Sequence, residues 1–186
     1  MREEVARDLS RSQQAFLNLV WPQFRHLGFG ELEPVEAVTA AGFQKELDTR
    51  AGIDQWVLQD TDDGHKIIRG VASRVQWGDR AWDTFTVRME RSTGGLTEFA
   101  KRMKQLATPG AVSPHYTLQA YVTSDRTRLL SAAICLTEDL MRIVDSGDCV
   151  KRSTTDGAGT QTFCVVPWSK LPAHRCMQLH AQKEAA

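Results

Sequence analysis

The chain has 186 residues, of which 41% are hydrophobic and 25% charged, and its formal net charge is zero. This content is too apolar for a disordered chain, and the length suits one domain over residues 1–186. No apolar run approaches the roughly 20 residues that cross a bilayer, and the charged N-terminal stretch has no signal-peptide core behind it. We therefore expect a cytoplasmic protein with no membrane partner.

The predicted elements follow from hydrophobic periodicity and turn residues. In chain order they are a helix over 2–27, a candidate strand over 31–39 that Pro34 interrupts, strands over 52–60, 65–77 and 82–89, a helix over 97–106, a strand over 115–123, a helix over 126–146 and a strand over 160–167. From about residue 172 we expect a short helix in a flexible tail. Pro22 should split the first helix near Trp21, and Gly28 should end it.

The segments 52–60 and 65–77 give the clearest local pattern, because the turn Thr61-Asp62-Asp63-Gly64 separates them. They should form a hairpin, followed directly by the strand over 82–89. Without the candidate strand over 31–39, the order is thus α-β-β-β-α-β-α-β. It predicts an α+β fold with a mixed β-sheet flanked by helices.

The four cysteines, Cys135, Cys149, Cys164 and Cys176, are widely spaced and contain no C-x-x-C pair. A cytoplasmic location keeps thiols reduced, so no disulfide is expected. Charge is unevenly divided, since residues 1–65 carry 6 Lys/Arg and 12 Asp/Glu, and residues 66–186 carry 17 and 11. This division suits a metal-assisted phosphodiester site, and it equally suits charge complementarity within the molecule.

Polar side chains gather on the hairpin in a pattern that predicts a site. Asp54 stands at a strand start, and alternation places Arg74 and Gln76 on one face of the returning strand. Glu46 and Asp48 lie just upstream and are candidates for a second carboxylate near Asp54. Hard divalent cations such as magnesium bind carboxylate and amide oxygens.

Cationic side chains complete the predicted site. Arg74 and Arg88 are suited to stabilise charge on a reacting phosphate. Lys101, Arg102 and Lys104 are candidate contacts to nucleic-acid phosphates, or else the solvated face of the helix over 97–106.

The run Gly52-Ile53-Asp54, then a strand, a turn and Val71-Ala72-Ser73-Arg74-Val75-Gln76, resembles the core of the PD-(D/E)XK nucleases. In that superfamily, which includes restriction endonucleases, Holliday-junction resolvases and Mrr-like enzymes, an Asp on one strand and a Glu or Gln on the next hold magnesium. A Lys two residues later positions the water. The resemblance implies a restriction-endonuclease-like fold, with Mg²⁺ (or Mn²⁺) at Asp54 and Gln76. Gly78 occupies the Lys position, so Arg74, Arg88 or a cation on another strand would supply that charge.

The leading hypothesis is therefore a metal-dependent, nuclease-like protein that acts on DNA phosphodiesters, a possible Mg²⁺-dependent endonuclease. The missing Lys favours an alternative, a catalytically inactive pseudo-nuclease that binds nucleic acid or protein in a microbial complex. A third hypothesis is a protein-interaction subunit, or a homodimer, in which the sheet is only a scaffold. Nucleic-acid cleavage, binding without cleavage, or a tight protein partner would separate the three.

Overall fold

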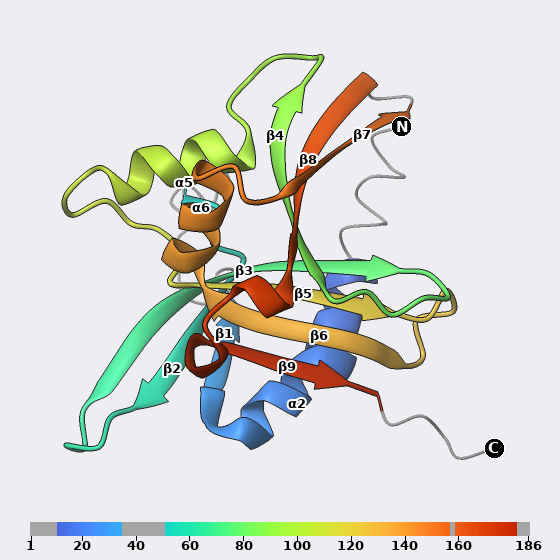
Figure 1. Ribbon diagram of the computed structural model, residues 1–186. Helices are drawn as coiled ribbons and strands as arrows, with labels where there is room; N and C mark the ends of the chain where they lie inside the picture. The colour runs from blue at the N-terminus through green and yellow to red at the C-terminus, as the bar shows by residue number, and fades with distance from the viewer. Residues whose placement is uncertain (1–10, 35–50, 157–158, 182–186) are drawn as a thin grey trace.

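The structure is a computed structural model that describes residues 11–34, 51–156 and 159–181 (Figure 1). The described chain contains, in order, helical turns over Phe16–Val20, α2 (Trp21–Phe24), helical turns over Arg25–Phe29, β1 (Glu31–Pro34), β2 (Gln55–Asp60), β3 (Lys66–Trp77), β4 (Thr84–Arg91), α5 (Glu98–Leu106), β5 (Tyr116–Val122), β6 (Leu129–Leu136), α6 (Thr137–Asp145), β7 (Val150–Asp156), β8 (Gly159–Pro167), short 3₁₀ turns at Trp168–Lys170 and Ala173–Arg175, and β9 (Cys176–His180). The chain is thus a mixed α+β protein, as the sequence predicts.

The N-terminal helical stretch changes register at Trp21, directly before Pro22. Gly28 has a φ of 87°, a conformation in which only glycine is unstrained, and the helical path ends there. Both features confirm the predicted break and stop. The predicted strand over 31–39 is seen as β1, and its residues after Pro34 lie outside the described residues, as does most of the predicted loop before Gly52.

The larger sheet has six strands in the order β1-β2-β3-β5-β6-β9. The predicted hairpin is confirmed as β2 and β3, which pair antiparallel from Gln55–Val71 to Asp60–Lys66. β3 then pairs in parallel with β5, while the other neighbours in this sheet are antiparallel. The sheet is therefore mixed, again as expected.

The strand after the hairpin does not join this sheet, which corrects the predicted order of three successive paired strands. β4 instead forms a separate three-stranded sheet with β8 and β7, in the order β4-β8-β7. β7 was missed from the sequence because its residues, VKRSTTD, form a polar edge strand without buried alternation.

The helix predicted over 126–146 is also wrong. Its first part is strand β6, and only Thr137–Asp145 is helical, as α6. Residues 131–135 are buried on both faces of the sheet, and a continuous apolar run of this kind cannot be told from a buried helix by periodicity. The tail beyond Pro172 likewise contains β9, which pairs with β6 at the sheet edge, rather than a fraying helix.

Two hydrophobic clusters lie on opposite faces of the six-stranded sheet. One packs the N-terminal helical stretch, through Phe16, Val20 and Phe24, against residues such as Leu118 and Ile134. The other packs α6 and the three-stranded sheet against the opposite face. The molecule thus has three layers, and α5 lies with β4 on the second of these faces (Figure 1).

Cys149 and Cys164 are joined by a disulfide that ties the start of β7 to β8, with their Cα atoms 5.6 Å apart. This corrects the expectation that all four thiols are free, whereas Cys135 and Cys176 are free and buried. Among the described residues, no helix is both long enough and apolar enough to span a membrane.

Candidate functional site

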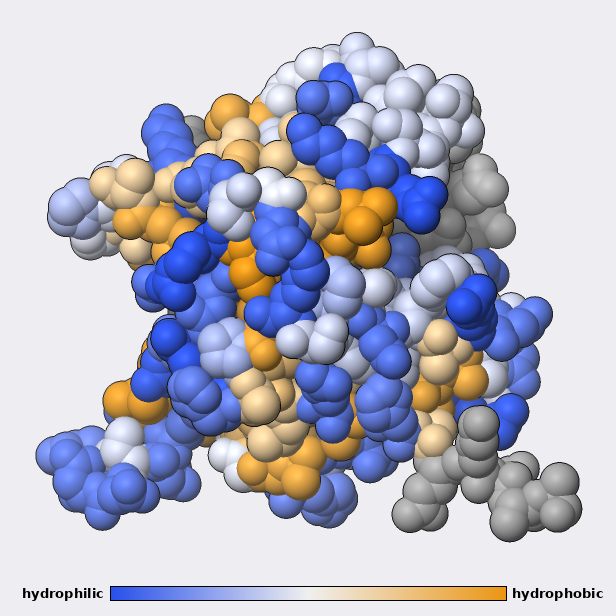
Figure 2. Space-filling model, viewed as in Figure 1, coloured by the Kyte–Doolittle hydropathy of each residue, from blue (hydrophilic) through white to orange (hydrophobic). Residues whose placement is uncertain are grey.

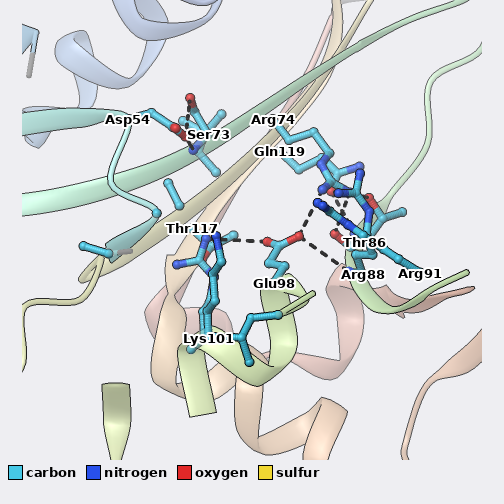
Figure 3. A pocket seen from close by; sticks show the side chains of 16 residues that line it. Asp54, Ser73, Arg74, Thr86, Arg88, Arg91, Glu98, Lys101, Thr117 and Gln119 are labelled. Carbon is cyan, nitrogen blue, oxygen red and sulfur yellow. Dashed lines mark hydrogen bonds and ion pairs between the residues drawn. The ribbon is translucent and has the colours of Figure 1, made fainter. Parts of the chain in front are cut away.

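A pocket of about 300 Å³ lies where the six-stranded sheet, β4 and α5 meet (Figure 3). Its wall combines small side chains with many charged ones. The lining residues are Ala51, Gly52, Asp54, Ala72, Ser73, Arg74, Thr86, Arg88, Arg91, Leu96, Glu98, Lys101, Arg102, Thr117, Leu118 and Gln119.

Helix α5 supplies three charged residues because of its spacing and its cap. Thr97 caps the helix by accepting a hydrogen bond from the amide of Ala100 (3.3 Å). Residues three and four apart share one helix face, so Glu98, Lys101 and Arg102 all reach the same pocket. The sequence singled out the two cations but not Glu98, although a glutamate four residues before an arginine is a recognisable signal.

Glu98 lies between the guanidinium groups of two arginines. Its Oε2 is 3.0 Å from Arg74 Nη2, and its Oε1 is 3.5 Å from Arg102 Nη2 (Figure 3). Burial raises the pKa of Glu98, but the charges of Arg74 and Arg102 outweigh it, and the net pKa lies below the ordinary value. Glu98 is therefore an anion whose charge is already matched by its neighbours.

Arg102 is the most deeply placed cation of the pocket, with a side chain only 7% exposed. Within the described part of the chain, its Nε and Nη1 have no hydrogen-bond partner. Its Nη2 forms an ion pair with Glu98 at 3.5 Å. Buried charged donors are normally satisfied, so an incompletely bonded guanidinium on a pocket wall indicates a place for a ligand acceptor.

Arg74 is fixed in place by the opposite strand of the second sheet. Its Nη1 donates to the carbonyl oxygen and the hydroxyl of Thr86, at 3.1 and 2.9 Å. Thr86 in turn donates from its amide to Gln119 Oε1 (2.8 Å). This network connects β3, β4 and β5, so the guanidinium of Arg74 is held rigidly at the pocket.

Asp54 lies at the opposite side of the pocket from Arg74 and Arg88 (Figure 3). Its Oδ2 accepts hydrogen bonds from the amide of Ser73 (2.6 Å) and from the Ser73 hydroxyl (3.3 Å). Because Gln55 is opposite Val71 in the hairpin, Asp54 stands beside Ala72 and Ser73. The predicted carboxylate therefore does reach a pocket, held by the neighbouring strand.

The predicted site residues are only partly brought together. Asp54, Arg74, Arg88, Lys101 and Arg102 line the same pocket. Gln76 does not line it. Its Oε1 instead accepts a hydrogen bond from Gln119 Nε2 (3.0 Å). Gln76 lies three residues beyond Ser73 on β3, which is about 10 Å along the strand.

Three further predicted residues lie elsewhere. Lys104 is exposed on α5 and is not part of the pocket wall. Glu46 and Asp48 lie outside the described residues.

Charge in the pocket is strongly unbalanced although the chain as a whole is neutral. Among the lining residues that the structure describes, five cations, Arg74, Arg88, Arg91, Lys101 and Arg102, face two carboxylates, a formal excess of three positive charges. One of the two carboxylates, Glu98, is already bound to arginines. The pocket is therefore suited to an anion.

A magnesium site would need more oxygen ligands than the described part of the pocket clearly offers. Across residues 11–34, 51–156 and 159–181, no three His, Cys, Asp or Glu side chains cluster as metal ligands. Asp54 fits a hard cation as one carboxylate ligand. Further ligands would come from backbone carbonyls, water or the segment that contains Glu46 and Asp48.

Comparisons with models of known protein families, with curated proteins and with solved structures give no match for this chain.

Proposed function

We propose that this pocket binds a phosphodiester group of nucleic acid, in a nuclease-like protein that acts on DNA with Mg²⁺ or Mn²⁺. The observation that carries the proposal is Arg102, a buried guanidinium whose Nε and Nη1 have no hydrogen-bond partner among the described residues, on the wall of a pocket with excess positive charge. Phosphate oxygens are acceptors that match the planar donor pattern of arginine.

The hairpin register supports a restriction-endonuclease-like arrangement in a form that differs from the one the sequence suggested. Asp54 stands beside Ala72 and Ser73, so the strand position next to the carboxylate is occupied by these residues rather than by Gln76. Two residues beyond Ala72 is Arg74, a cation that faces the pocket. In this alignment Arg74 takes the place of the superfamily Lys, and Ala72 leaves the second ligand position without a donor.

The residues of the pocket then have distinct tasks. Arg102 and Lys101 bind the phosphate from α5, and Arg74 and Arg88 lie across the pocket to stabilise charge that develops on it. Asp54 would hold the metal ion, which when bound supplies an activated water and charge neutralisation. Glu98 keeps the guanidinium groups of Arg74 and Arg102 in place without binding substrate.

Binding of a 5′-labelled DNA oligonucleotide to the Arg102→Met variant tests the phosphate site. We expect affinity to fall by at least about tenfold, because a charge-assisted phosphate contact is lost. The variant should still fold cooperatively in urea, with some loss of stability, because Glu98 loses its 3.5 Å pair with Arg102 but keeps the 3.0 Å pair with Arg74. Arg142→Met is the matched control, since Arg142 pairs with Glu138 four residues earlier on α6 but is 63% exposed.

Cleavage is tested separately with Asp54→Asn, which keeps an oxygen acceptor for Ser73. This variant should lose Mg²⁺- or Mn²⁺-dependent DNA cleavage and retain DNA binding. Wild-type protein that binds no DNA, with or without metal, would contradict the whole proposal.

The second candidate function is a pseudo-nuclease that binds nucleic acid, or a protein partner, without cutting. The observation that favours it is Ala72, which provides no ligand beside Asp54. Wild-type protein that binds DNA in the pocket but cleaves neither DNA nor RNA with Mg²⁺ or Mn²⁺ would establish this function in place of the first.

A further inference from the structure

The three-stranded sheet extends the pocket wall from β4 across β8 to β7. Across β4, β8 and β7, Arg88 is opposite Phe163, and Phe163 is opposite Arg152. Directly opposite residues in antiparallel strands point to the same face of the sheet. Arg152 on the edge strand therefore shares a face with Arg88.

The next row on the same face lies closer to the tip of the sheet. Arg91 is opposite Gln161, which is opposite Thr154. These three side chains are polar, and Arg91 also lines the pocket. In Figure 2 the tips of β7 and β8, at the upper right, are covered by pale and blue side chains rather than orange ones.

Contacts to the Phe163 ring show that this is the face on which the pocket lies. The guanidinium carbons of Arg74 and Arg88 are 5.8 and 5.4 Å from the centre of that ring. The opposite face of the same sheet is apolar near the body, where Val87 and Cys164 are buried in the core. Lys151, which is opposite Cys164, belongs to that other face.

We infer that the pocket-side face of β4, β8 and β7 binds single-stranded nucleic acid that leaves the pocket, with Arg152 contacting a further phosphate. This inference rests on the proposed function, because the strand is anchored by the phosphate in the pocket. Two strand spacings, about 10 Å, separate Arg88 from Arg152, so the second phosphate contact lies beyond the one in the pocket.

The chemistry of the face favours a single strand over a duplex. A row of arginines with a half-buried aromatic ring, Phe163, between them combines backbone attraction with a surface for base stacking. A single strand can present both phosphates and base faces to such a surface, whereas a duplex keeps its bases stacked on each other.

The test compares two exposed cations that are neighbours on β7 but point to opposite faces. Arg152→Ala should weaken binding of a 20-nucleotide single-stranded DNA by about three- to tenfold, and should reduce the slope of log affinity against log salt by about 0.7. Lys151→Ala should change the affinity less than twofold and leave the slope unaltered. Both side chains are exposed, so neither variant should disturb folding.

Equal effects of Arg152→Ala and Lys151→Ala would overturn the inference while leaving the pocket proposal intact. An effect of Arg152→Ala on a duplex of the same sequence but not on the single strand would overturn it as well. Wild-type protein that binds neither DNA would overturn the pocket proposal itself, so the two failures are distinguishable.

Discussion

Glu98 controls the charge of the pocket because it is an anion between the guanidinium groups of Arg74 and Arg102. Its lowered pKa means that it stays ionised well into the acid range, despite the opposing effect of burial. A ligand phosphate would compete with this carboxylate for the same donors. Glu98 is thus expected to stabilise the empty pocket and to weaken ligand binding, two effects that one substitution can separate.

Glu98→Gln should destabilise the protein by about 1–3 kcal/mol, because buried arginine donors lose a charged acceptor. The same change should tighten binding of single-stranded DNA by about two- to tenfold, because one negative charge leaves the pocket. Urea unfolding at pH 7 and fluorescence anisotropy measure the two effects. Glu138→Gln is the control, since Glu138 also precedes an arginine by four residues but is 62% exposed, and should change stability by less than about 0.5 kcal/mol. Weaker binding by a folded Glu98→Gln protein would show that the carboxylate itself holds a ligand or metal.

His115 makes stability depend on pH at a site away from the pocket. Burial and the neighbouring charges of Arg69 and Arg175 lower its pKa from 6.5 to about 4. The neutral ring is hydrogen-bonded to Arg69 through Nε2. Between these two values the unfolded chain binds more protons than the folded one, so stability present above pH 6.5 is lost as the pH falls towards 4.

His115→Gln should reduce this pH dependence while keeping an acceptor for Arg69. The expected result is a smaller difference in urea midpoint between pH 7 and pH 5 than in the wild type. An unchanged difference would show that other groups cause the acid sensitivity.

At the scale of elements, glycine at position 70 connects the packing of β3 to the position of Asp54. A Cβ at Gly70 would lie 2.8 Å from Cδ1 of Ile53, a fully buried side chain. The space beside Gly70 is therefore filled by the residue directly before Asp54. Position 70 must stay small if the segment 51–54 is to reach the pocket.

Gly70→Ala should cost about 1–3 kcal/mol of stability, because Ile53 must shift in a packed environment. Asp54 should move with it, so metal-dependent cleavage should fall more than DNA binding does. Gly78→Ala, at the end of the same strand, is the control because a Cβ there meets nothing within 4 Å. Equal, small effects of both substitutions would argue against a link between Ile53 packing and the site.

Local patterns in the sequence predicted the elements whose signals are themselves local. The β2–β3 hairpin, which has a strong turn, is confirmed, and the helix predicted over 97–106 is seen as α5. β6 was misread because its residues face cores on both sides, and β4 was placed in the wrong sheet because adjacency in sequence does not determine strand pairing. The same holds for the site. The sequence predicted single cations of the pocket, but the ion pairs around Glu98 depend on contacts between elements that are distant in the sequence.

On the scale of the whole molecule, the net charge is zero, but negative and positive side chains lie in different places. Asp60, Asp62 and Asp63 lie around the tip of the β2–β3 hairpin, which projects at the lower left of Figure 1, away from α5. The pocket has a formal excess of three positive charges. A nucleic acid should therefore approach with its backbone towards the pocket and away from the hairpin tip.

The salt dependence of DNA binding distinguishes direct contacts to phosphates from long-range attraction and repulsion. With three or four phosphates bound, log affinity for single-stranded DNA should fall with log salt with a slope of about −2 to −3. Arg91→Ala should make the slope shallower by about 0.7, because Arg91 lines the pocket and would release a counterion. Asp62→Asn should raise the affinity slightly at low salt and not at high salt, so it should steepen the slope by much less than 0.7, because an exposed carboxylate at the hairpin tip repels the strand without touching it. If Asp62→Asn altered the slope as much as Arg91→Ala, the nucleic acid would have to extend along the hairpin, and the path from the pocket across β4, β8 and β7 would be wrong.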